Sequence, residues 1–205
     1  EKFHSTPAND GGTRFVRSCP QTPEQARTDP TFANGTIVSA SFGPSQQRPF
    51  YSTFSINLTS AYSSKITDYV RTFCFLNLDN AQTPAVLIVL DSITTSNPEF
   101  RKYWQANTLN PPETTEDGVI LRNSDLGLNG KVTLQMLRPT AADRELQVLS
   151  GKDANSVFGQ FFTPPKPDRP EANGHRMMFS PVKSRAKDTF LTVMSMSDED
   201  APELP

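Results

Sequence analysis

The sequence predicts an all-β protein, an antiparallel β-sandwich of about ten or more short strands with little helix. The first observation is a period of two: in 51–59, Phe54, Ile56 and Leu58 alternate with polar residues, as on a strand with one wet face. The second is the 18 prolines spread along the chain, which interrupt helices and central strands. The third is the turn-forming segments between apolar runs, which favour packed antiparallel sheets over βαβ units.

Strand-like segments follow one another along the whole chain. In order they are 36–42, 51–59, 69–78, 85–93, 100–108, 118–123, 131–137, 145–151, 156–162, 175–180 and 188–196. Turn signals such as NLDNAQTP, TTSNPE, EDG and LGLNGK separate several of them. Brief helical turns are expected only at 22–29 and at 60–69, and the second is rich in Ser and Thr, which are weak helix formers.

The chain divides into three parts of different composition. Residues 1–35 are polar and contain Gly11-Gly12, which predicts an irregular lead-in. Residues 36–197 carry the strands and form a single sandwich domain, and 198–205 are an acidic, proline-containing tail. Inside the sandwich, the proline-rich segment 163–174 is typical of a surface loop or of a loop that covers a site. A chain of 205 residues is long enough to bury a core without staples.

The charge balance limits the partners. Twenty basic and 22 acidic residues give a net charge of -2, so no basic face for nucleic acid is indicated. An anionic polysaccharide remains an option, because a local Arg/Lys cleft can exist on a near-neutral protein. No apolar run is long enough to span a membrane. Glu1 is neither an initiator Met nor the start of a signal peptide, which suggests a mature or excised piece.

Motifs for metals, phosphates and nucleophiles are absent from the sequence. Cys19 and Cys74 could form one disulfide or remain two thiols, and their spacing does not decide between these. The two histidines, His4 and His175, stand in distant contexts without an H-x-H or C-x-x-C pattern, so neither a metal nor a cofactor is expected. There is also no G-x-S-x-G elbow and no P-loop.

The segment FRKYW at 100–104 invites a sugar-binding interpretation. Trp and Tyr faces stack on pyranose rings, and Arg or Lys can pair with sulfate or carboxylate. On a strand, however, Phe100, Lys102 and Trp104 face one way and Tyr103 the other. The favoured interpretation therefore places Trp104 in the core, with the Lys102 amine reaching water at the edge.

Two further polar residues are candidates for chemistry. Asp91 follows the apolar run 85–90, where burial could raise its pKa for acid/base work, although such a residue more often caps a turn or pairs with an arginine. His175 stands beside Arg176 and could bind an anion; the alternative is an ordinary polar start of a strand.

Five segments in order carry a family resemblance: 10–15, 58–80, 84–107, 130–139 and 188–196. The most specific parts are the block from Pro84 to Trp104 and a block composed of Ala61, Tyr62, Ser64, Lys65, Arg71, Phe73 and Phe75 to Leu78. On these segments, and over roughly residues 8–197 as a whole, the chain resembles the C-terminal β-sandwich region of heparinase II/III-like polysaccharide lyases.

The resemblance implies a larger enzyme, secreted or periplasmic, in which an α-helical toroid precedes the sandwich and uronate-containing polysaccharide is cleaved by β-elimination. In that reaction a base removes the uronate C5 proton while another group neutralises the carboxylate. The family's catalytic Tyr and His, and the zinc site of some members, have no matching position here, and Thr13 stands where the family has Gln. The chain is therefore expected to be a fragment, a processed half or a relative that kept only the sandwich. It is expected to line the substrate cleft without a catalytic residue of its own.

Arg14, Arg48 and His175 are the predicted substrate contacts, because they lie in or beside loops where a cleft rim could form. Two other functions stay open. One is a non-catalytic carbohydrate-binding sandwich that uses Trp104 or Tyr103 as a stacking platform. The other is a structural or interaction module that makes contact through 163–174 or through an open sheet edge.

Overall fold

The structure, a computed structural model, describes residues 19–202 except 30–31, 33, 124–126 and 158–159. The strands in this part of the chain are β1 (Thr36–Pro44), β2 (Pro49–Asn57), β3 (Ile66–Asn77), β4 (Ala85–Thr95), β5 (Trp104–Thr108), β6 (Glu113–Thr114), β7 (Gly118–Asn123), β8 (Gly130–Arg138), β9 (Arg144–Ser150), β10 (Ser156–Val157), β11 (Gln160–Phe161), β12 (His175–Pro181) and β13 (Lys187–Asp198).

Helical structure is confined to short pieces in the described residues. The α-helix α1 (Pro23–Thr28) lies where a helical turn is predicted, with Pro23 in its first turn and the Thr22 hydroxyl accepting from the Gln25 amide at 3.1 Å. The 3-10 turns are η2 (Thr59–Ala61), η4 (Ala141–Asp143), η5 (Gly151–Asn155) and η6 (Pro170–Asn173). No helix described here is long and apolar enough to cross a membrane.

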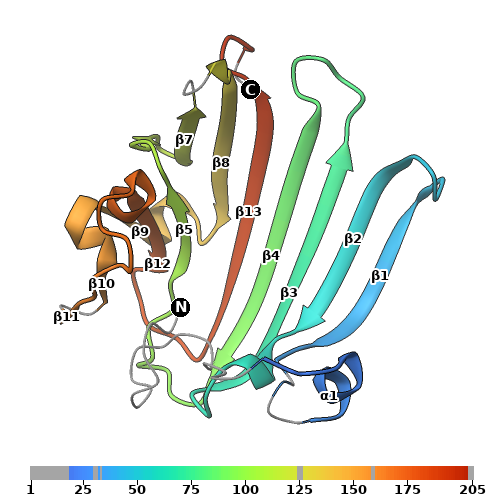
Figure 1. Ribbon diagram of the computed structural model, residues 1–205, viewed down its shortest axis with the longest axis vertical. Helices are drawn as coiled ribbons and strands as arrows, with labels where there is room; N and C mark the ends of the chain where they lie inside the picture. The colour runs from blue at the N-terminus through green and yellow to red at the C-terminus, as the bar shows by residue number, and fades with distance from the viewer. Residues whose placement is uncertain (1–18, 30–31, 33, 124–126, 158–159, 203–205) are drawn as a thin grey trace.

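The strands form two main antiparallel sheets (Figure 1). The large sheet has eight strands in the order β1-β2-β3-β4-β13-β8-β7-β6, the small sheet has the order β5-β12-β9, and β10 pairs with β11 in a hairpin. The C-terminal strand β13 lies between β4 and β8, so it joins the N-terminal strands to the middle of the chain. The predicted all-β antiparallel sandwich is confirmed.

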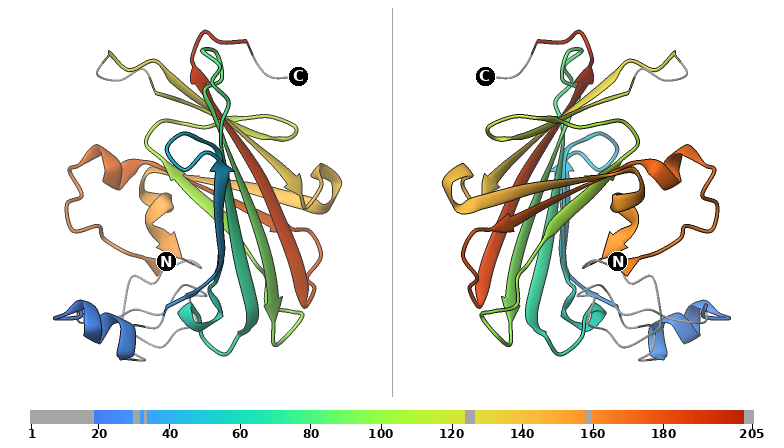
Figure 2. Two further views of the ribbon diagram at one scale, coloured as in Figure 1. Left: turned by 90° about the vertical axis from the view of Figure 1, so that its right-hand side faces the viewer. Right: turned by 90° about the vertical axis from the view of Figure 1, so that its left-hand side faces the viewer.

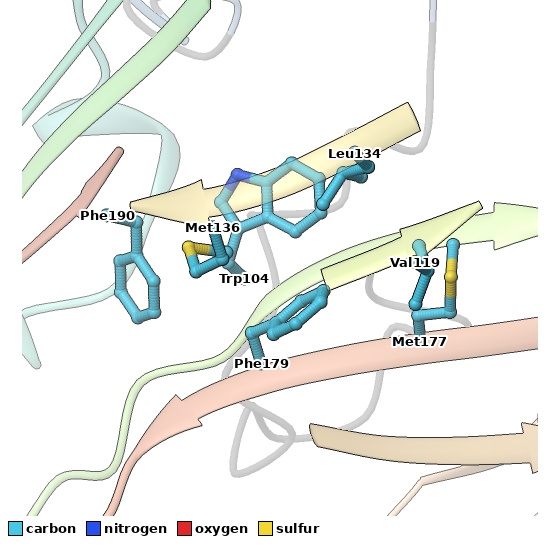
Figure 3. Close-up of a cluster of buried hydrophobic side chains, with 7 residues drawn as sticks. All are labelled: Trp104, Val119, Leu134, Met136, Met177, Phe179 and Phe190. Carbon is cyan, nitrogen blue, oxygen red and sulfur yellow. The ribbon is translucent and has the colours of Figure 1, made fainter. Parts of the chain in front are cut away.

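The hydrophobic core lies between the small sheet and one end of the large sheet. Figure 3 shows its seven buried side chains: Trp104, Val119, Leu134, Met136, Met177, Phe179 and Phe190. The rings of Trp104 and Phe179 meet edge to face with centroids 6.1 Å apart. The small sheet therefore covers β7, β8 and β13, and no second layer formed by the described residues covers the other end of the large sheet.

That other end is formed by β1, β2 and β3, over which Figures 1 and 2 show no strand of the small sheet. The register places Phe42, Ser52, Phe75, Leu87 and Met194 opposite one another across five strands, so they share the face that becomes the core further along. Phe42 and Phe75 are nevertheless exposed. The same sheet face is thus core at one end and surface at the other.

Several predicted elements differ in detail from the observed ones. The single strand predicted at 100–108 begins only at Trp104, the strand predicted at 156–162 is the hairpin β10–β11, and the helical turn predicted at 60–69 is limited to Thr59–Ala61. The apolar run before Asp91 is buried only in part, because Leu90 points to the face of the large sheet that no second sheet covers.

The predicted placement of Lys102 at a wet edge is wrong. Lys102 is buried, and its Nζ donates to Asp188 Oδ2 at 2.8 Å and to the carbonyls of Phe100 and Arg185. The residues before β5 leave the strand conformation and pass beside the start of β13, which brings the two charges together.

Candidate functional site

A cleft of about 990 Å³ lies where the covered and uncovered ends of the large sheet meet. One wall contains Tyr69 and Arg71 of β3 and Ile93 of β4, with Tyr62 and Lys65 from the segment before β3. The opposite wall is the small sheet and the turns that follow β9, which contribute Gln105, Asn107, Gln147, Asp153, Asn155, His175, Arg176 and Met178. Polar side chains from segments far apart in the sequence therefore face a common space.

The β3 wall is organised around the buried carboxylate of Asp91. Asp91 lies opposite Arg71 in the register of β3 and β4, and Tyr69 is two residues from Arg71 on the same face. Arg71 binds the carboxylate with two hydrogen bonds, Nε to Oδ1 at 2.6 Å and Nη2 to Oδ2 at 2.9 Å, and the Tyr69 hydroxyl donates to Oδ1 at 2.9 Å. The charge of Arg71 is therefore neutralised within the chain.

Both tyrosines of this wall are held in the neutral form. Burial, followed by the nearby Asp91 carboxylate, raises the pKa of Tyr69 far above its ordinary value of 10.0. Burial also raises the pKa of Tyr62, whose ring lies 5.5 Å from that of Tyr69. At neutral pH both are therefore hydrogen-bond donors and not phenolate bases.

The small-sheet wall contains a buried arginine with few partners. Arg176 is 8% exposed, and its Nη2 donates to the carbonyl of Ser156. Its Nε has no hydrogen-bond acceptor among the described residues, and burial lowers the pKa of its guanidinium. Asn107 and Leu149 lie beside Arg176 on the neighbouring strands, on the face that points away from the core.

The predicted substrate contacts have different positions. His175 begins β12 and lines the cleft, with its Nδ1 2.8 Å from the Ser150 hydroxyl oxygen. Arg48 is exposed in the turn between β1 and β2 and is not among the residues that line the cleft. Arg14 lies outside the described residues. Of the two described residues, only His175 lies at the cleft.

The residues of the candidate site that sequence reasoning missed are Tyr69 and Arg176. From the sequence, an arginine is one expected partner of Asp91. Identifying that arginine as Arg71 requires the register between β3 and β4. Arg176 was noted only as a neighbour of His175. The two side chains point to opposite faces of β12, and only the tertiary structure shows that Arg176 is buried beside the cleft.

Three other expectations concern Trp104, the cysteines and metals. Trp104 is 7% exposed and packs in the core, as favoured from the sequence, so it offers no stacking platform. Cys19 is exposed and Cys74 half-buried, and both are free thiols. Within the described residues no group of three His, Cys, Asp or Glu side chains could hold a metal ion.

No family model matches this chain, and no curated protein matches it in sequence. Solved structures do match. The heparan sulfate lyase HepC from Pedobacter heparinus superposes with a TM-score of 0.51 and 15% sequence identity over 82% of this chain and 23% of that chain. A heparinase III structure gives a TM-score of 0.47 and 10% identity, with 82% and 22% covered, and the heparinase III-BT4657 gene product gives 0.46 and 13%, with 95% and 29% covered.

The comparison with HepC establishes a shared fold. An identity of 15% is too low to transfer a function, so the chain has the fold of one part of the heparan sulfate lyase and nothing more follows directly. The resemblance stated from the sequence is confirmed at this level. The chain spans about a quarter of the length of the structures it matches.

Proposed function

We propose that this chain is the β-sandwich portion of a heparinase II/III-like polysaccharide lyase, a secreted or periplasmic enzyme that cleaves uronate-containing polysaccharide by β-elimination. The observation that carries the proposal is the fold shared with HepC over 82% of this chain and only 23% of that chain. The polar cleft beside β3 supports it, because an acidic polysaccharide needs a groove that offers hydrogen-bond donors and positive charge.

The role of this chain in the reaction is to line the substrate cleft and not to supply the base. β-Elimination requires a base that can take the C5 proton and a group that neutralises the uronate carboxylate. Tyr62 and Tyr69 have raised pKa values, and the Tyr69 proton is bound to Asp91. The β3 wall thus offers hydrogen-bond donors, and neither Tyr62 nor Tyr69 is prepared as a base.

The proposal includes an α-helical toroid, as a domain or as a separate chain, that completes the cleft. An exposed apolar surface on the first two strands supports such a partner: Ile37 and Val38 are 64% and 59% exposed, and Phe42 and Phe50 about half exposed. A partner that covers these side chains is favoured, because it removes their apolar area from water. Among the described residues β1 is also an edge strand of the large sheet.

Two proteins should be compared to test this function: the product of the complete reading frame that encodes this chain, and this chain alone. Each is incubated with heparan sulfate, chondroitin sulfate, alginate and polygalacturonate, and the absorbance of the unsaturated uronate is followed. We expect product from the complete protein on at least one polymer and none from the chain alone. Absence of product from the complete protein on every acidic polymer would contradict the lyase, and product from the chain alone would contradict its non-catalytic role.

Matched variants of the complete protein test the proposed substrate contacts. His175→Ala lies at the cleft and should raise KM, whereas Arg48→Ala, in an exposed turn outside it, should leave KM nearly unchanged. An equal effect of the two variants would remove His175 from the substrate contacts. Arg14 stays a prediction from the sequence.

A non-catalytic carbohydrate-binding module is the second candidate, and the position of Tyr103 favours it. Tyr103 is 37% exposed and lines the cleft, and the Arg101 guanidinium lies 5.6 Å from its ring. An exposed aromatic ring next to a cation suits an acidic sugar. If the complete protein binds acidic glycans without forming product, and Tyr103→Ala abolishes that binding, this second function replaces the first.

A further inference from the structure

Most cations of the cleft are neutralised by a carboxylate of the chain itself. Arg71 pairs with Asp91, and Lys102 pairs with Asp188 at 2.8 Å. Arg101 pairs with Glu145 and also donates to the Ser180 hydroxyl at 2.8 Å. Arg176 differs, since no carboxylate of the described residues forms an ion pair with it.

A comparison with Arg144 shows how a partly buried arginine is satisfied by backbone carbonyls, without an ion pair among the described residues. Burial lowers the pKa of both guanidinium groups. Three backbone carbonyls, those of Met136, Pro139 and Glu116, accept from Arg144 at 2.7, 3.1 and 2.8 Å. Arg176 donates to one carbonyl, that of Ser156, and its Nε is buried without an acceptor. The guanidinium of Arg144 is thus satisfied by three hydrogen bonds within the chain, whereas that of Arg176 has one.

The unsatisfied donors belong to residues of the cleft lining. Among the described residues two buried side-chain nitrogen atoms lack a hydrogen-bond partner, Arg176 Nε and Trp104 Nε1, and both residues line the cleft. A buried cation or donor without a partner is costly, so such a group indicates a ligand that completes it. The cleft volume of about 990 Å³ is within the range of ligand pockets.

The neighbours of Arg176 suit a sugar. Asn107 lies beside Arg176 on β5, and Gln105 and Gln147 occupy the next row of the same sheet face. All three line the cleft, and an amide can both donate to and accept from a sugar hydroxyl. The amides are neutral, whereas the guanidinium of Arg176 is positively charged and has a planar pair of donors that suits an oxyanion.

We propose that Arg176 is an oxyanion site that binds a carboxylate or sulfate group of an acidic sugar within the cleft of this chain. The identification of the ligand as a glycan rests on the proposed function. The assignment of an oxyanion as the bound group does not rest on it, because Arg176 forms no ion pair with a described residue. Arg176 is thus a binding residue, and this chain binds acidic glycan without its catalytic partner.

The test is a binding measurement on this chain alone. Calorimetric titrations use a heparan sulfate hexasaccharide, an unsulfated oligogalacturonate of equal length, a neutral cello-oligosaccharide and inorganic sulfate. The variant Arg176→Met is compared with Arg138→Met, an exposed arginine of β8 outside the cleft whose loss changes the net charge equally. We expect Arg176→Met to weaken acidic glycan binding about tenfold or more, Arg138→Met to change it little, and the neutral sugar not to bind.

A second measurement does not depend on the stability of a variant. In the nitrogen-proton NMR spectrum, the Nε–H resonance of Arg176, assigned by its loss in Arg176→Lys, should move downfield when the acidic oligosaccharide is added, because the nitrogen gains an acceptor. Binding of both acidic oligosaccharides identifies the carboxylate as the ligand group, and binding of the sulfated one alone identifies sulfate.

Three results would overturn the site: no binding of either acidic oligosaccharide, equal weakening by Arg176→Met and Arg138→Met, or an Arg176 Nε–H resonance that does not move at saturation. None of them decides the lyase assay, which uses the complete protein. Conversely, a complete protein that forms no unsaturated product, together with Arg176-dependent binding by this chain, would contradict the proposed lyase and leave the oxyanion site in place.

Discussion

The two walls of the cleft treat positive charge in opposite ways. On the β3 wall, Arg71 is held by two hydrogen bonds to Asp91, and Tyr69 supplies a third to the same carboxylate. On the small-sheet wall, Arg176 is buried with one carbonyl partner and no carboxylate of the described residues. The difference separates two uses of a charged group: the first stabilises the fold, and the second keeps a charge available to a ligand at the expense of stability.

The largest loss of stability is expected for a variant of the ion pair between Lys102 and Asp188, the most buried pair among the described residues. The side chains of Lys102 and Asp188 are 5% and 6% exposed and connect the segment before β5 with β13. Asp188→Asn leaves the ammonium buried without its counter-charge, and we expect the free energy of unfolding to fall by about 3–5 kcal/mol. Urea denaturation followed by Trp104 fluorescence measures it. A loss below about 1 kcal/mol would mean that this pair behaves as a surface pair.

A smaller loss is expected on the β3 wall. Asp91→Asn keeps the size of the side chain but removes the charge that Arg71 binds. Because the Arg71 side chain is 31% exposed and can regain some water, we expect a loss of about 2–4 kcal/mol, less than for Asp188→Asn. Glu145→Gln, in the exposed pair with Arg101, is the matched control and should cost less than about 1 kcal/mol. If control and variant lose the same amount, the β3 wall is not a structural centre.

Removal of one hydroxyl from the β3 wall should have a still smaller effect. Tyr69→Phe deletes the hydrogen bond to Asp91 and leaves Arg71 in place, so we expect a loss of about 1–2 kcal/mol at pH 7. A loss near zero would show that Arg71 alone satisfies the carboxylate. Because the ring stays, near-ultraviolet circular dichroism of the other aromatic groups should be retained and serves as the check on packing.

The raised pKa of Tyr69 gives this variant a pH dependence. The folded protein keeps the Tyr69 proton above pH 10, whereas the unfolded chain begins to lose it there, so the wild type loses stability as the pH rises beyond about 10. The phenylalanine side chain of the variant has no proton to lose. The stability difference between wild type and Tyr69→Phe should therefore be constant below about pH 9 and shrink above pH 10 by about 1.4 kcal/mol per pH unit. A difference that stays constant up to pH 11 would contradict the raised pKa.

The sequence predicts most of the fold and little of the site, for a physical reason. Alternation along a strand is local, so the positions of β3, β4, β7, β8 and β13 could be inferred from the residues themselves. Which strand lies beside which is not local: Arg71 meets Asp91 through strand register, and Lys102 meets Asp188 across 86 residues. The burial of Arg176 likewise depends on turns that follow β9, so its role is visible only in the tertiary structure.

The smallest effect on stability is expected where the effect on binding is largest. Arg176→Met retains much of the volume of the side chain, removes a buried unpaired charge and loses one hydrogen bond to Ser156, so these opposing changes should leave the free energy of unfolding within about 1 kcal/mol of the wild type. An acidic oligosaccharide that binds only the folded state should then raise the melting temperature of the wild type but not that of the variant. If instead Arg176→Met destabilises the protein as much as Asp91→Asn does, Arg176 belongs to the structural class of charges, and the contrast between the two walls disappears.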